Sequence, residues 1–354
     1  MSSKKIHVAA WPKSKNRKNN PYNYILYEAM ADLADVDEFN HRRMSLSSEQ
    51  VLHLHWPDKV VADKRTWRMR WRSWRLRSAM KKLQKRGGKV VWTVHNLRAH
   101  KLRHPDLAKK LLEKFINLVD GFIFLSAESQ KLFFEEYPRV RATPSIVTPH
   151  IHYGDYYRLE SGNDLAREHM NIHEHDTVLL MFGKISEHKG LLELVEAKTN
   201  SELECVRVVV AGSANSDSIT QQGISAAKRN PDFIVNDARI PTDQVAAYFQ
   251  ISDGVILPYT AILNSGTAML ALSLHRPVIG PRVGSFIALE EEFGGDWVHL
   301  YDAPLDAEKF DNACSWLRNR QVNVDIREIE ALSRCDPKVV AAQTVTFYRQ
   351  LLGE

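Results

Sequence analysis

Short apolar runs rich in β-branched residues alternate with longer helix-like segments along the chain, and this alternation constrains the fold most strongly. Consecutive strands joined through a helix run parallel, because the helix returns the chain to the edge of the sheet where the first strand began. The pattern therefore predicts an α/β protein built from doubly wound, largely parallel sheets.

The predicted elements form two successive series. In the first half, strands are predicted at residues 6–10, 51–55, 89–94, 121–125 and 145–148. In the second half, strands are predicted at residues 177–182, 206–211, 233–235, 254–257 and 277–279. The predicted helices include residues 22–35, 105–118, 190–197, 218–229, 243–251, 267–274 and 337–352.

The length of the chain predicts two domains, because 354 residues exceed one ordinary domain and allow each of two to bury its own core. We expect two Rossmann-like domains at residues 1–155 and 156–335, with a polar stretch that lacks a clear period at 160–176. A last helix, within residues 336–354, is expected to pack back on the first domain. Ligands of open parallel sheets bind beyond the carboxyl ends of the strands. Two such domains would face each other across a cleft.

Charge is distributed unevenly between the halves. Residues 1–150 hold 30 Lys and Arg against 14 Asp and Glu, a net charge of +16, whereas the whole chain carries +5. The remainder is therefore acidic, with a net charge of −11. A strongly basic half predicts a polyanionic partner, either nucleic acid or an anionic membrane.

Three features of the sequence bear on where the protein is found in the cell, and all three favour the cytoplasm. No run approaches the roughly 18 apolar residues of a spanning helix, and the N-terminus lacks the apolar core of a secretory signal. The three cysteines are far apart and show neither metal-ligand nor redox spacing: Cys205, Cys314 and Cys335. A reducing, cytoplasmic location is therefore expected.

The second half contains two segments suited to binding a diphosphate. Gly183 and Lys184 follow a predicted strand, and Lys189 and Gly190 open a predicted helix. Glycine allows close approach of the backbone, lysine adds positive charge, and a helix N-terminus offers unpaired N–H groups. Gly212 follows the neighbouring strand in the same way. The competing interpretation is a helix cap beside a surface lysine.

The second segment begins with Tyr259 in a loop and leads into a small-residue helix start. Its predicted ligand-binding residues are Asn264, Ser265, Gly266 and Thr267. Backbone N–H groups and hydroxyls there could hold phosphate oxygens. Helix capping is again the alternative, but the two segments occur one after the other in a single α/β unit.

Six blocks of the sequence resemble the xanthan-type β-mannosyltransferases of bacterial exopolysaccharide assembly. They are NPYNYILYEAM (20–30), VLHLHWPD (51–58), VVWTVHNLRAH (90–100), PHIHYGDYY (149–157), FGKISEHKGLLELV (182–195) and ILPYTAILNSGTAMLALSLHRPVIGP (256–281). The resemblance implies a GT-B fold, with the nucleotide sugar held by the second domain. It also implies inverting transfer from a GDP- or UDP-linked sugar to a polyprenyl-diphosphate-linked oligosaccharide, without a metal in the active site.

An inverting reaction requires a general base for the acceptor hydroxyl. The segment 261–273 contains no carboxylate, which disfavours a retaining enzyme of the common GT-B kind. Asp58 and His95 follow predicted strands of the first domain and are the two preferred candidates for the base. The family commonly has a glutamate where this chain has Lys101, which removes a third candidate. Capping of backbone groups by His95 and a turn role for Asp58 are the structural alternatives.

Four further residues are predicted to contact the acceptor or to lie near the hinge: Asn20, Tyr22, His150 and His152. Asn20 and Tyr22 follow a basic loop at residues 13–18 that could close on an anionic diphosphate. The histidines fall where the chain approaches the second domain. A disordered loop and simple linker packing are the respective alternatives.

Residues 64–86 form a basic, tryptophan-rich helix in this prediction. Trp67, Trp71 and Trp74 recur at helical spacing and share one face. Arginines occupy much of the rest, and those next to the tryptophans are Arg68, Arg72 and Arg75. Aromatic residues on one side and basic residues on the other are typical of a helix lying in an anionic bilayer interface. Packing of the tryptophans on the sheet, or binding of single-stranded nucleic acid, are the alternatives.

These observations together predict a peripheral enzyme on the inner face of the cell membrane that transfers mannose from GDP-mannose. A UDP-sugar transferase of the same fold, using glucuronic acid or glucose, is the second candidate. A nucleic-acid-binding protein and an inactive scaffold are the alternatives from other classes. No histidine pair has convincing ligand spacing with a carboxylate or cysteine, so we expect no metal and no cofactor beyond the nucleotide-sugar co-substrate.

Overall fold

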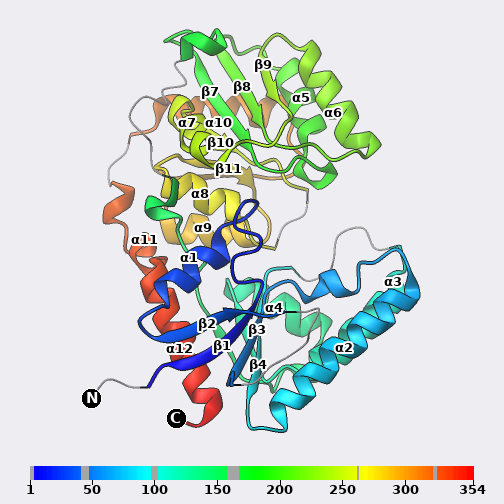
Figure 1. Cartoon of the computed structure of the whole chain (residues 1–354). Helices are drawn as coiled ribbons and strands as arrows, with labels where there is room; N and C mark the ends of the chain where they lie inside the picture. Colours follow the sequence, from blue (N-terminus) through cyan, green and yellow to red (C-terminus); the bar gives the residue numbers. More distant parts are fainter. Residues whose placement is uncertain (1–3, 41–47, 97–102, 158–166, 261–262, 322–324) are drawn as a thin grey trace. The chain divides into compact units, whose positions relative to one another are not determined.

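The computed structural model describes residues 4–40, 48–96, 103–157, 167–260, 263–321 and 325–354 (Figure 1). The chain forms two compact units. Unit 1 runs from the N-terminus to Ile151 and includes Arg334–Glu354, and unit 2 is His152–Ser333. The C-terminal segment therefore belongs to the same unit as the N-terminus. The predicted limits at 155 and 335 each fall close to this division.

Unit 1 contains a six-stranded sheet in the order β2-β1-β3-β4-β5-β6, in which every pair is parallel. Its strands are β1 (Ile6–Trp11), β2 (Ala34–Glu38), β3 (Val51–Leu54), β4 (Lys89–Val94), β5 (Gly121–Phe124) and β6 (Ser145–Val147). The central strands are almost wholly buried, as expected for a parallel sheet covered on both faces.

Helices cover both faces of this sheet (Figure 1). They are α1 (Tyr22–Ala29) and α12 (Pro337–Leu352) on one face, and α2 (Thr66–Gln84), α3 (Pro105–Ile116) and α4 (Ala127–Glu136) on the other. Successive side chains of β3 alternate between the two layers: Leu52 and Leu54 pack with α2, whereas Val51 packs with α1 and α12. The last helix of the chain thus completes the core around the first strand.

Unit 2 repeats this architecture with the strand order β12-β11-β10-β7-β8-β9, again parallel throughout. Its strands are β7 (Thr177–Phe182), β8 (Val206–Ala211), β9 (Phe233–Asn236), β10 (Gly254–Ile256), β11 (Val278–Pro281) and β12 (Val298–Tyr301). Its helices are α5 (Leu191–Thr199), α6 (Ser218–Arg229), α7 (Val245–Ile251), α8 (Gly266–Ser273), α9 (Ser285–Phe293) and α10 (Ala307–Asn319), and α11 (Glu330–Arg334) leads back to unit 1.

Short 3-10 helices connect several of these elements. They are η1 (Pro57–Val60), η2 (Pro138–Val140), η3 (Gly154–Tyr157), η4 (Arg167–Met170), η5 (Glu187–Lys189), η6 (Thr242–Gln244) and η7 (Ile326–Glu328). Two of them, η1 and η5, are the first elements after the central strands β3 and β7. They therefore hold candidate site residues at the edge where ligands of such sheets bind.

The predicted fold class is confirmed: the chain has two Rossmann-like parallel sheets with helices on both faces. One predicted helix is too long, however. The segment 22–35 ends as a helix at Ala29, and the chain re-enters the sheet as β2. This edge strand was missed, as was β12 at the edge of the other sheet. In β2, buried Ala34 and Val36 alternate with exposed Asp35 and Asp37. A short strand with charged side chains is typical of a sheet edge that is protected from pairing with another chain.

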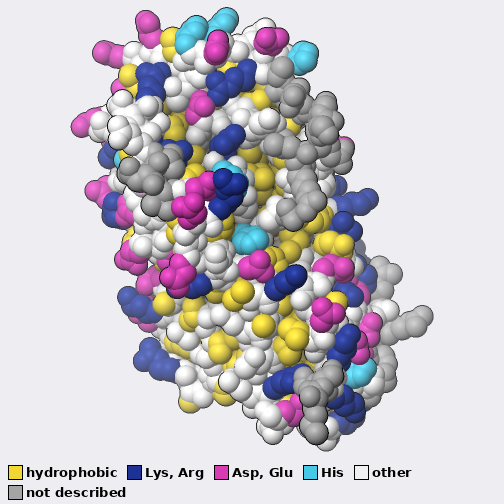
Figure 2. Space-filling model, turned by 90° about the vertical axis from the view of Figure 1, so that its left-hand side faces the viewer, with side chains coloured by type: hydrophobic (Ala, Val, Ile, Leu, Met, Phe, Trp, Pro, Cys, Tyr) yellow, Lys and Arg dark blue, Asp and Glu magenta, His cyan; other side chains and the backbone are white. Residues whose placement is uncertain are grey.

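Within the described ranges, no helix is both long enough and apolar enough to cross a membrane. The face drawn in Figure 2 carries Lys and Arg side chains interspersed with Asp and Glu, and apolar side chains lie between them. The basic excess of the first half is concentrated on α2, which has seven Lys and Arg and no acidic residue.

Candidate active site

The order of strands in unit 2 reverses at β7, whose two neighbours are β8 and β10. The loops that leave β7 and β10 at their carboxyl ends therefore run in opposite directions, and such a reversal of strand order is the usual ligand position in parallel sheets. The predicted donor-binding residues follow these two strands, apart from Gly212, which follows β8. We call this group the donor loops: residues 183–190, Gly212, and the part of 258–267 that the structure describes.

Two glycines let the donor loops approach each other at backbone distance. A Cβ on Gly190 would lie 1.9 Å from the carbonyl oxygen of Pro258, and Gly190 has a left-handed φ of +70°. A Cβ on Gly212 would lie 1.9 Å from the carbonyl oxygen of Gly183, with φ +145°. Neither position can hold a side chain without displacing backbone. The predicted glycines are thus required by packing between the loops.

The loop after β7 is also tied directly to the loop after β10. The amide of Thr260 donates a hydrogen bond of 3.0 Å to the carbonyl of His188, on η5. Lys189 places its Nζ 3.4 Å from the centroid of the Tyr259 ring, a cation–π contact. The Lys189 ammonium is therefore held against the loop after β10, whereas the Lys184 side chain is exposed.

Tyr259 has a feature that its contact with Lys189 does not explain. The residue is only 2% exposed, and its hydroxyl has no hydrogen-bond partner among the described residues. A buried hydroxyl without a partner costs free energy, of the order of 1–3 kcal/mol. Such a group at the carboxyl end of β10 is suited to bond a ligand.

The sequence offered two interpretations of the start of α8, ligand binding and helix capping, and the structure contains features of both. Ser265 is the N-cap, and its hydroxyl accepts a hydrogen bond of 3.0 Å from the Ala268 amide. That hydroxyl therefore serves the helix, as the capping alternative predicted. Gly266 and Thr267 begin the helix, and the Thr267 hydroxyl lies 3.5 Å from the Cβ position of Gly183. Asn264 precedes the cap and is half-buried.

In unit 1, the strand order reverses at β1, between β2 and β3. The residue after β3 is His55, whose amide donates to the Trp11 carbonyl at the end of β1, and the residue after the neighbouring β4 is His95. His95 stacks on Trp56 with ring centroids 4.5 Å apart, and Tyr22 packs edge-on against it at 5.1 Å. The predicted base His95 is therefore almost completely enclosed by aromatic rings, with 9% of its surface exposed.

A continuous set of hydrogen bonds leads from His95 into the core. His95 Nε2 lies 2.9 Å from His55 Nδ1, and His55 Nε2 lies 2.6 Å from the Tyr27 hydroxyl. Both Tyr27, at 2.8 Å, and Tyr348, at 2.6 Å, contact His53 Nδ1. His53 Nε2 in turn contacts the Thr93 hydroxyl at 2.7 Å. Every ring nitrogen of His53 and His55 is thus hydrogen-bonded, which allows these polar groups to be buried.

Burial keeps these histidines uncharged at neutral pH. It lowers the pKa of His53 to about 3 and that of His150 to about 4, and it lowers the pKa values of His55 and His95 well below the usual range. Each neutral ring carries one N–H and one lone pair. His95 is therefore in the unprotonated form that a general base requires.

The other predicted site residues of unit 1 differ in how they relate to the cluster formed by these histidines and tyrosines. Tyr22 is buried and packs against His95 and His150, and burial raises its pKa. His150 donates from Nδ1 to the Ile151 carbonyl at 2.8 Å. Asn20 accepts a hydrogen bond of 2.9 Å from the Tyr22 amide at the start of α1. Asp58 is half-buried on η1, beside the exposed Lys59.

His152 belongs to unit 2, where its ring lies 3.1 Å from the Cβ position of Gly154. The roles in acceptor binding predicted for Asn20, Tyr22, His150 and His152 remain predictions. Lys101, where the chain departs from the family, lies outside the described residues.

The tryptophans of α2 project away from the core. Trp67, Trp71 and Trp74 are 60%, 48% and 60% exposed, so they do not pack on the sheet. The opposite face of the helix is buried through Met69, Ser73, Leu76, Ala79, Met80 and Leu83. The prediction of aromatic residues on one side and basic residues on the other is therefore wrong, because the core occupies the second side. Tryptophans and arginines share the outer face.

Contacts between these side chains support a mixed surface. The Arg68 guanidinium lies 5.3 Å from the Trp67 ring and that of Arg75 lies 4.7 Å from the Trp71 ring. Arg72 forms an ion pair of 3.0 Å with Asp63. We call Trp67, Trp71 and Trp74 with Arg68, Arg72 and Arg75 the α2 surface.

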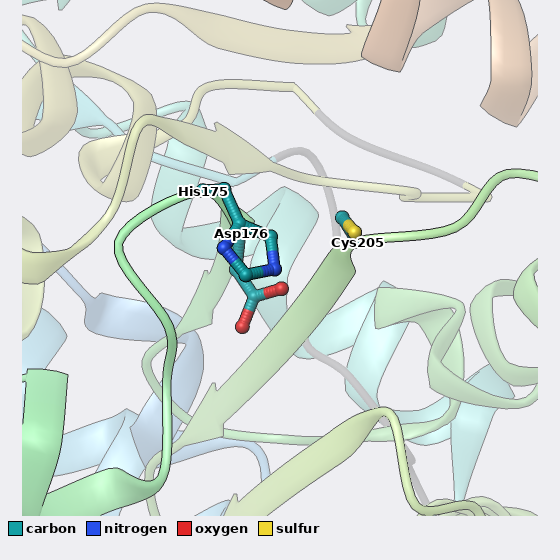
Figure 3. A group of neighbouring side chains, drawn as sticks. All are labelled: His175, Asp176 and Cys205. Atoms are coloured by element: carbon teal, nitrogen blue, oxygen red, sulfur yellow. The ribbon is translucent and has the colours of Figure 1, made fainter.

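Three side chains of the types that bind metal ions lie at the end of the unit 2 sheet opposite to the donor loops. Side chains of His175, Asp176 and Cys205 come together at the amino ends of β7 and β8, with ligand atoms all within 4.8 Å of one another (Figure 3). Imidazole, carboxylate and thiolate are ligands that zinc accepts. One Asp176 oxygen already accepts from the His173 amide at 2.8 Å. This group is separated from the donor loops by the length of β7, about 20 Å.

Several residues of the unit 1 cluster were not singled out from the sequence. His53, His55, Tyr27 and Tyr348 form most of its hydrogen bonds. A signal was present in the VLHLH segment, where histidines two residues apart in a strand point to the same face. The tyrosines come from α1 and α12 and carry no local pattern that points to a histidine.

Similar proteins were found by sequence and by structure. Two GDP-mannose:glycolipid 4-beta-D-mannosyltransferases of Xanthomonas campestris pv. campestris are 28% and 27% identical over 299 residues, which is 82% of this chain and 78% of each relative. A lipopolysaccharide 1,2-N-acetylglucosaminetransferase of Salmonella typhimurium is 29% identical over 148 residues, 39% of this chain and 38% of that protein. No protein-family model matches the chain.

Solved structures agree in fold. Sucrose-phosphate synthase from Thermosynechococcus elongatus has a TM-score of 0.69 at 15% identity, covering 99% of this chain and 100% of its own. Anabaena HepE in complex with UDP has a TM-score of 0.69 at 15% identity, covering 98% of this chain and 100% of its own. A glycosyltransferase from Rickettsia africae has a TM-score of 0.68 at 13% identity and covers 99% of each chain. The chain is therefore a glycosyltransferase of the GT-B fold, similar in sequence to the xanthan-type β-mannosyltransferases.

Proposed function

We propose that the protein transfers mannose from GDP-mannose, with inversion, to a polyprenyl-diphosphate-linked oligosaccharide in exopolysaccharide assembly. The observation that carries this proposal is the arrangement of the donor loops at the carboxyl ends of β7, β8 and β10. The choice of mannose and of a glycolipid acceptor follows the names of the two Xanthomonas relatives. A UDP-sugar donor is the second candidate, since the structurally similar Anabaena protein is in complex with UDP.

In this proposal the donor loops hold the diphosphate of the nucleotide sugar. The Lys189 ammonium and the first N–H groups of α8 supply the positive potential that the leaving diphosphate needs. The Tyr259 hydroxyl would satisfy its missing hydrogen bond with a donor oxygen. These groups replace a metal ion in stabilising the leaving group, so no metal is required.

Unit 1 supplies the general base. Inversion requires one displacement at the anomeric carbon, assisted by a group that removes the acceptor proton. His95 is our first choice, because it is uncharged and held by Trp56, Tyr22 and His55. Asp58, four residues after β3, is the second candidate.

The α2 surface would attach the enzyme to the anionic inner face of the cell membrane, where a polyprenyl-linked acceptor resides. Exposed tryptophans prefer the boundary between headgroups and acyl chains, and each nearby Lys or Arg contributes about 1 kcal/mol. Three large exposed aromatic side chains on one helix are otherwise unfavourable in water. The same surface could instead bind single-stranded nucleic acid, and binding assays with vesicles and with oligonucleotides distinguish the two partners.

A thermal-shift panel tests the donor site. We expect GDP and GDP-mannose to raise the melting temperature of the purified chain, because a ligand present at 100 times its dissociation constant adds about 2.7 kcal/mol to the free energy of unfolding. UDP, ADP, UDP-glucose and UDP-glucuronate serve as competitors. Lys189→Met should abolish the shift while leaving the melting temperature without ligand nearly unchanged. Stabilisation by UDP compounds alone would move the assignment to a UDP-sugar transferase, and a flat response would favour an inactive scaffold.

Removal of the α2 tryptophans tests membrane attachment. The triple variant Trp67→Ala, Trp71→Ala, Trp74→Ala should bind phosphatidylglycerol vesicles at least tenfold more weakly in a co-sedimentation assay, a loss of about 1.4 kcal/mol or more. The folded state should be preserved, because substitutions of exposed residues usually change stability by less than about 0.5 kcal/mol.

The matched control replaces exposed apolar residues away from α2, Ile219→Ala and Val339→Ala, and should leave vesicle binding unchanged. Unchanged binding of the triple variant would contradict the membrane assignment. Tight binding of oligothymidylate with a steep salt dependence, and none to vesicles, would instead support a nucleic-acid partner.

A further inference from the structure

We propose that His175, Asp176 and Cys205 bind one zinc ion, which ties the amino ends of β7 and β8 together. We call these three residues the β7–β8 triad. All three belong to unit 2, and they lie at the end of its sheet opposite to the donor loops (Figure 3). The role of this site is therefore structural, and it does not depend on the transfer reaction.

The pairing of β7 with β8 brings the triad together. Thr177 is the first residue of β7 and is paired with Val206, the first residue of β8. Asp176 and Cys205 each precede these residues by one position, so they begin the two strands side by side. His175 comes from the turn before β7. The ligand atoms of the triad all lie within 4.8 Å of one another.

The chemistry of the triad suits zinc. Imidazole nitrogen, carboxylate oxygen and thiolate sulfur are common zinc ligands, whereas magnesium and calcium take oxygen ligands. With bonds of about 2.0–2.3 Å, a tetrahedral site separates its ligand atoms by about 3.3–3.8 Å. Rotation of the exposed His175 and Cys205 side chains is enough to bring the triad to these distances. Three protein ligands leave the fourth position to water.

The carboxylate of Asp176 is the observation that points to a cation. The residue is only 6% exposed. Its Oδ2 accepts a hydrogen bond of 2.8 Å from the His173 amide, and Oδ1 accepts none from the residues that the structure describes. Arg167 donates to the main-chain carbonyl of Asp176, at 3.2 Å, and so does not neutralise the carboxylate. A buried negative charge without a counterion is unfavourable, and a metal ion would supply the counterion.

The backbone of Cys205 is fixed, while its thiol is exposed. Its φ is +55°, a value that residues other than glycine seldom adopt. Its carbonyl accepts hydrogen bonds from the Thr177 amide at 2.8 Å and from Arg318 at 3.0 Å. The His175 ring is stacked on that of His173, with centroids 5.5 Å apart. Both ligands therefore start from restrained positions, which reduces the entropy lost when a metal binds.

The reactivity of the exposed thiol tests the site in the whole chain. Cys205 is exposed, whereas Cys314 and Cys335 are buried, so Ellman's reagent should modify one thiol in the folded chain. We expect one equivalent of Zn²⁺ to slow this reaction at least tenfold, and Mg²⁺ at the same concentration to leave it unchanged. Co²⁺ should give a thiolate-to-metal charge-transfer absorption that is lost in Cys205→Ser.

Ligand variants and a matched control locate the metal. Cys205→Ser, His175→Ala and Asp176→Asn should each weaken Zn²⁺ binding about tenfold or more in titration calorimetry. His169→Ala removes another exposed histidine of unit 2 and should bind Zn²⁺ as tightly as the unmodified chain. Hydrogen–deuterium exchange at residues 171–177 and 201–206 should slow when Zn²⁺ is added to the unmodified chain, and should not change in Cys205→Ser.

Unchanged thiol reactivity in the presence of Zn²⁺ would overturn the proposal. Equal affinity in the three ligand variants and in His169→Ala would do the same, because the metal would then be an adventitious ion bound elsewhere. Exchange at the two strand starts that stays unchanged with Zn²⁺ bound would contradict the structural role. None of these measurements uses sugar transfer, so their results are independent of the proposed function.

Discussion

His95→Gln is expected to lower kcat by about 10²- to 10⁴-fold, the usual contribution of a general base. The glutamine amide can reach the position of Nε2 and keep the contact with His55, but it cannot accept a proton at neutral pH. Binding of the nucleotide sugar should be unaffected, because the donor loops belong to unit 2. The KM for GDP-mannose should therefore stay within about threefold while the chemical step slows.

Single-turnover kinetics with GDP-mannose and the acceptor glycolipid would measure this effect. Asp58→Asn is the matched variant, since Asp58 is the other candidate and the substitution keeps its shape. A full rate in His95→Gln combined with a large loss in Asp58→Asn would transfer the role of base to Asp58. Retention of the full rate by both variants would remove both candidates and leave the fold assignment intact.

Gly190→Ala is expected to lower the free energy of unfolding by about 3 kcal/mol and to abolish nucleotide binding. An alanine here adopts a left-handed φ of +70°, which costs about 1–2 kcal/mol. Its Cβ also meets the Pro258 carbonyl oxygen at 1.9 Å, and displacing backbone typically costs another 1–3 kcal/mol. Since Gly190 follows Lys189, the displacement would also move the ammonium away from Tyr259.

Gly353→Ala separates the two causes. Gly353 has a similar left-handed conformation, with φ +80° and ψ 27°, but nothing lies within 4 Å of its Cβ position. This control should cost only the backbone strain, about 1–2 kcal/mol, and should bind GDP normally. Urea unfolding of both variants, with GDP titrations on the folded proteins, would give the difference. Equal destabilisation by the two substitutions would show that the donor loops do not approach each other at backbone distance.

The sequence alone was sufficient for the architecture, and it placed the predicted donor-binding residues at the carboxyl ends of parallel strands. Ten of the parallel strands follow from buried β-branched runs, because such strands are apolar on both faces and stand out from their surroundings. The donor loops follow from glycines and lysines immediately after those strands, a local pattern with a local cause. The two missed strands, β2 and β12, lie at sheet edges, where half of the pattern faces solvent and resembles other structure.

The tertiary structure decided what local patterns do not contain. It turned the tryptophans of α2 outward, because Leu76, Met80 and Leu83 on the opposite side already fill the space above the sheet. Pairing of β7 with β8 brought Cys205 beside His175 and Asp176, although Asp176 and Cys205 are 29 positions apart in the chain. Folding of α12 onto the first unit brought Tyr348 to His53 across 295 residues.

The buried, hydrogen-bonded histidines His53, His55 and His95 show where the limit of the sequence lies. The alternation in VLHLH determined that His53 and His55 share one face of a strand, since side chains alternate along any strand. Which groups meet them there was decided by the packing of α1 and of the neighbouring strand β4. A histidine in a core needs partners for both nitrogens, and these partners come from segments whose own sequences are arranged for packing. Charge state, tautomer and chemical role therefore emerge only when the elements are assembled.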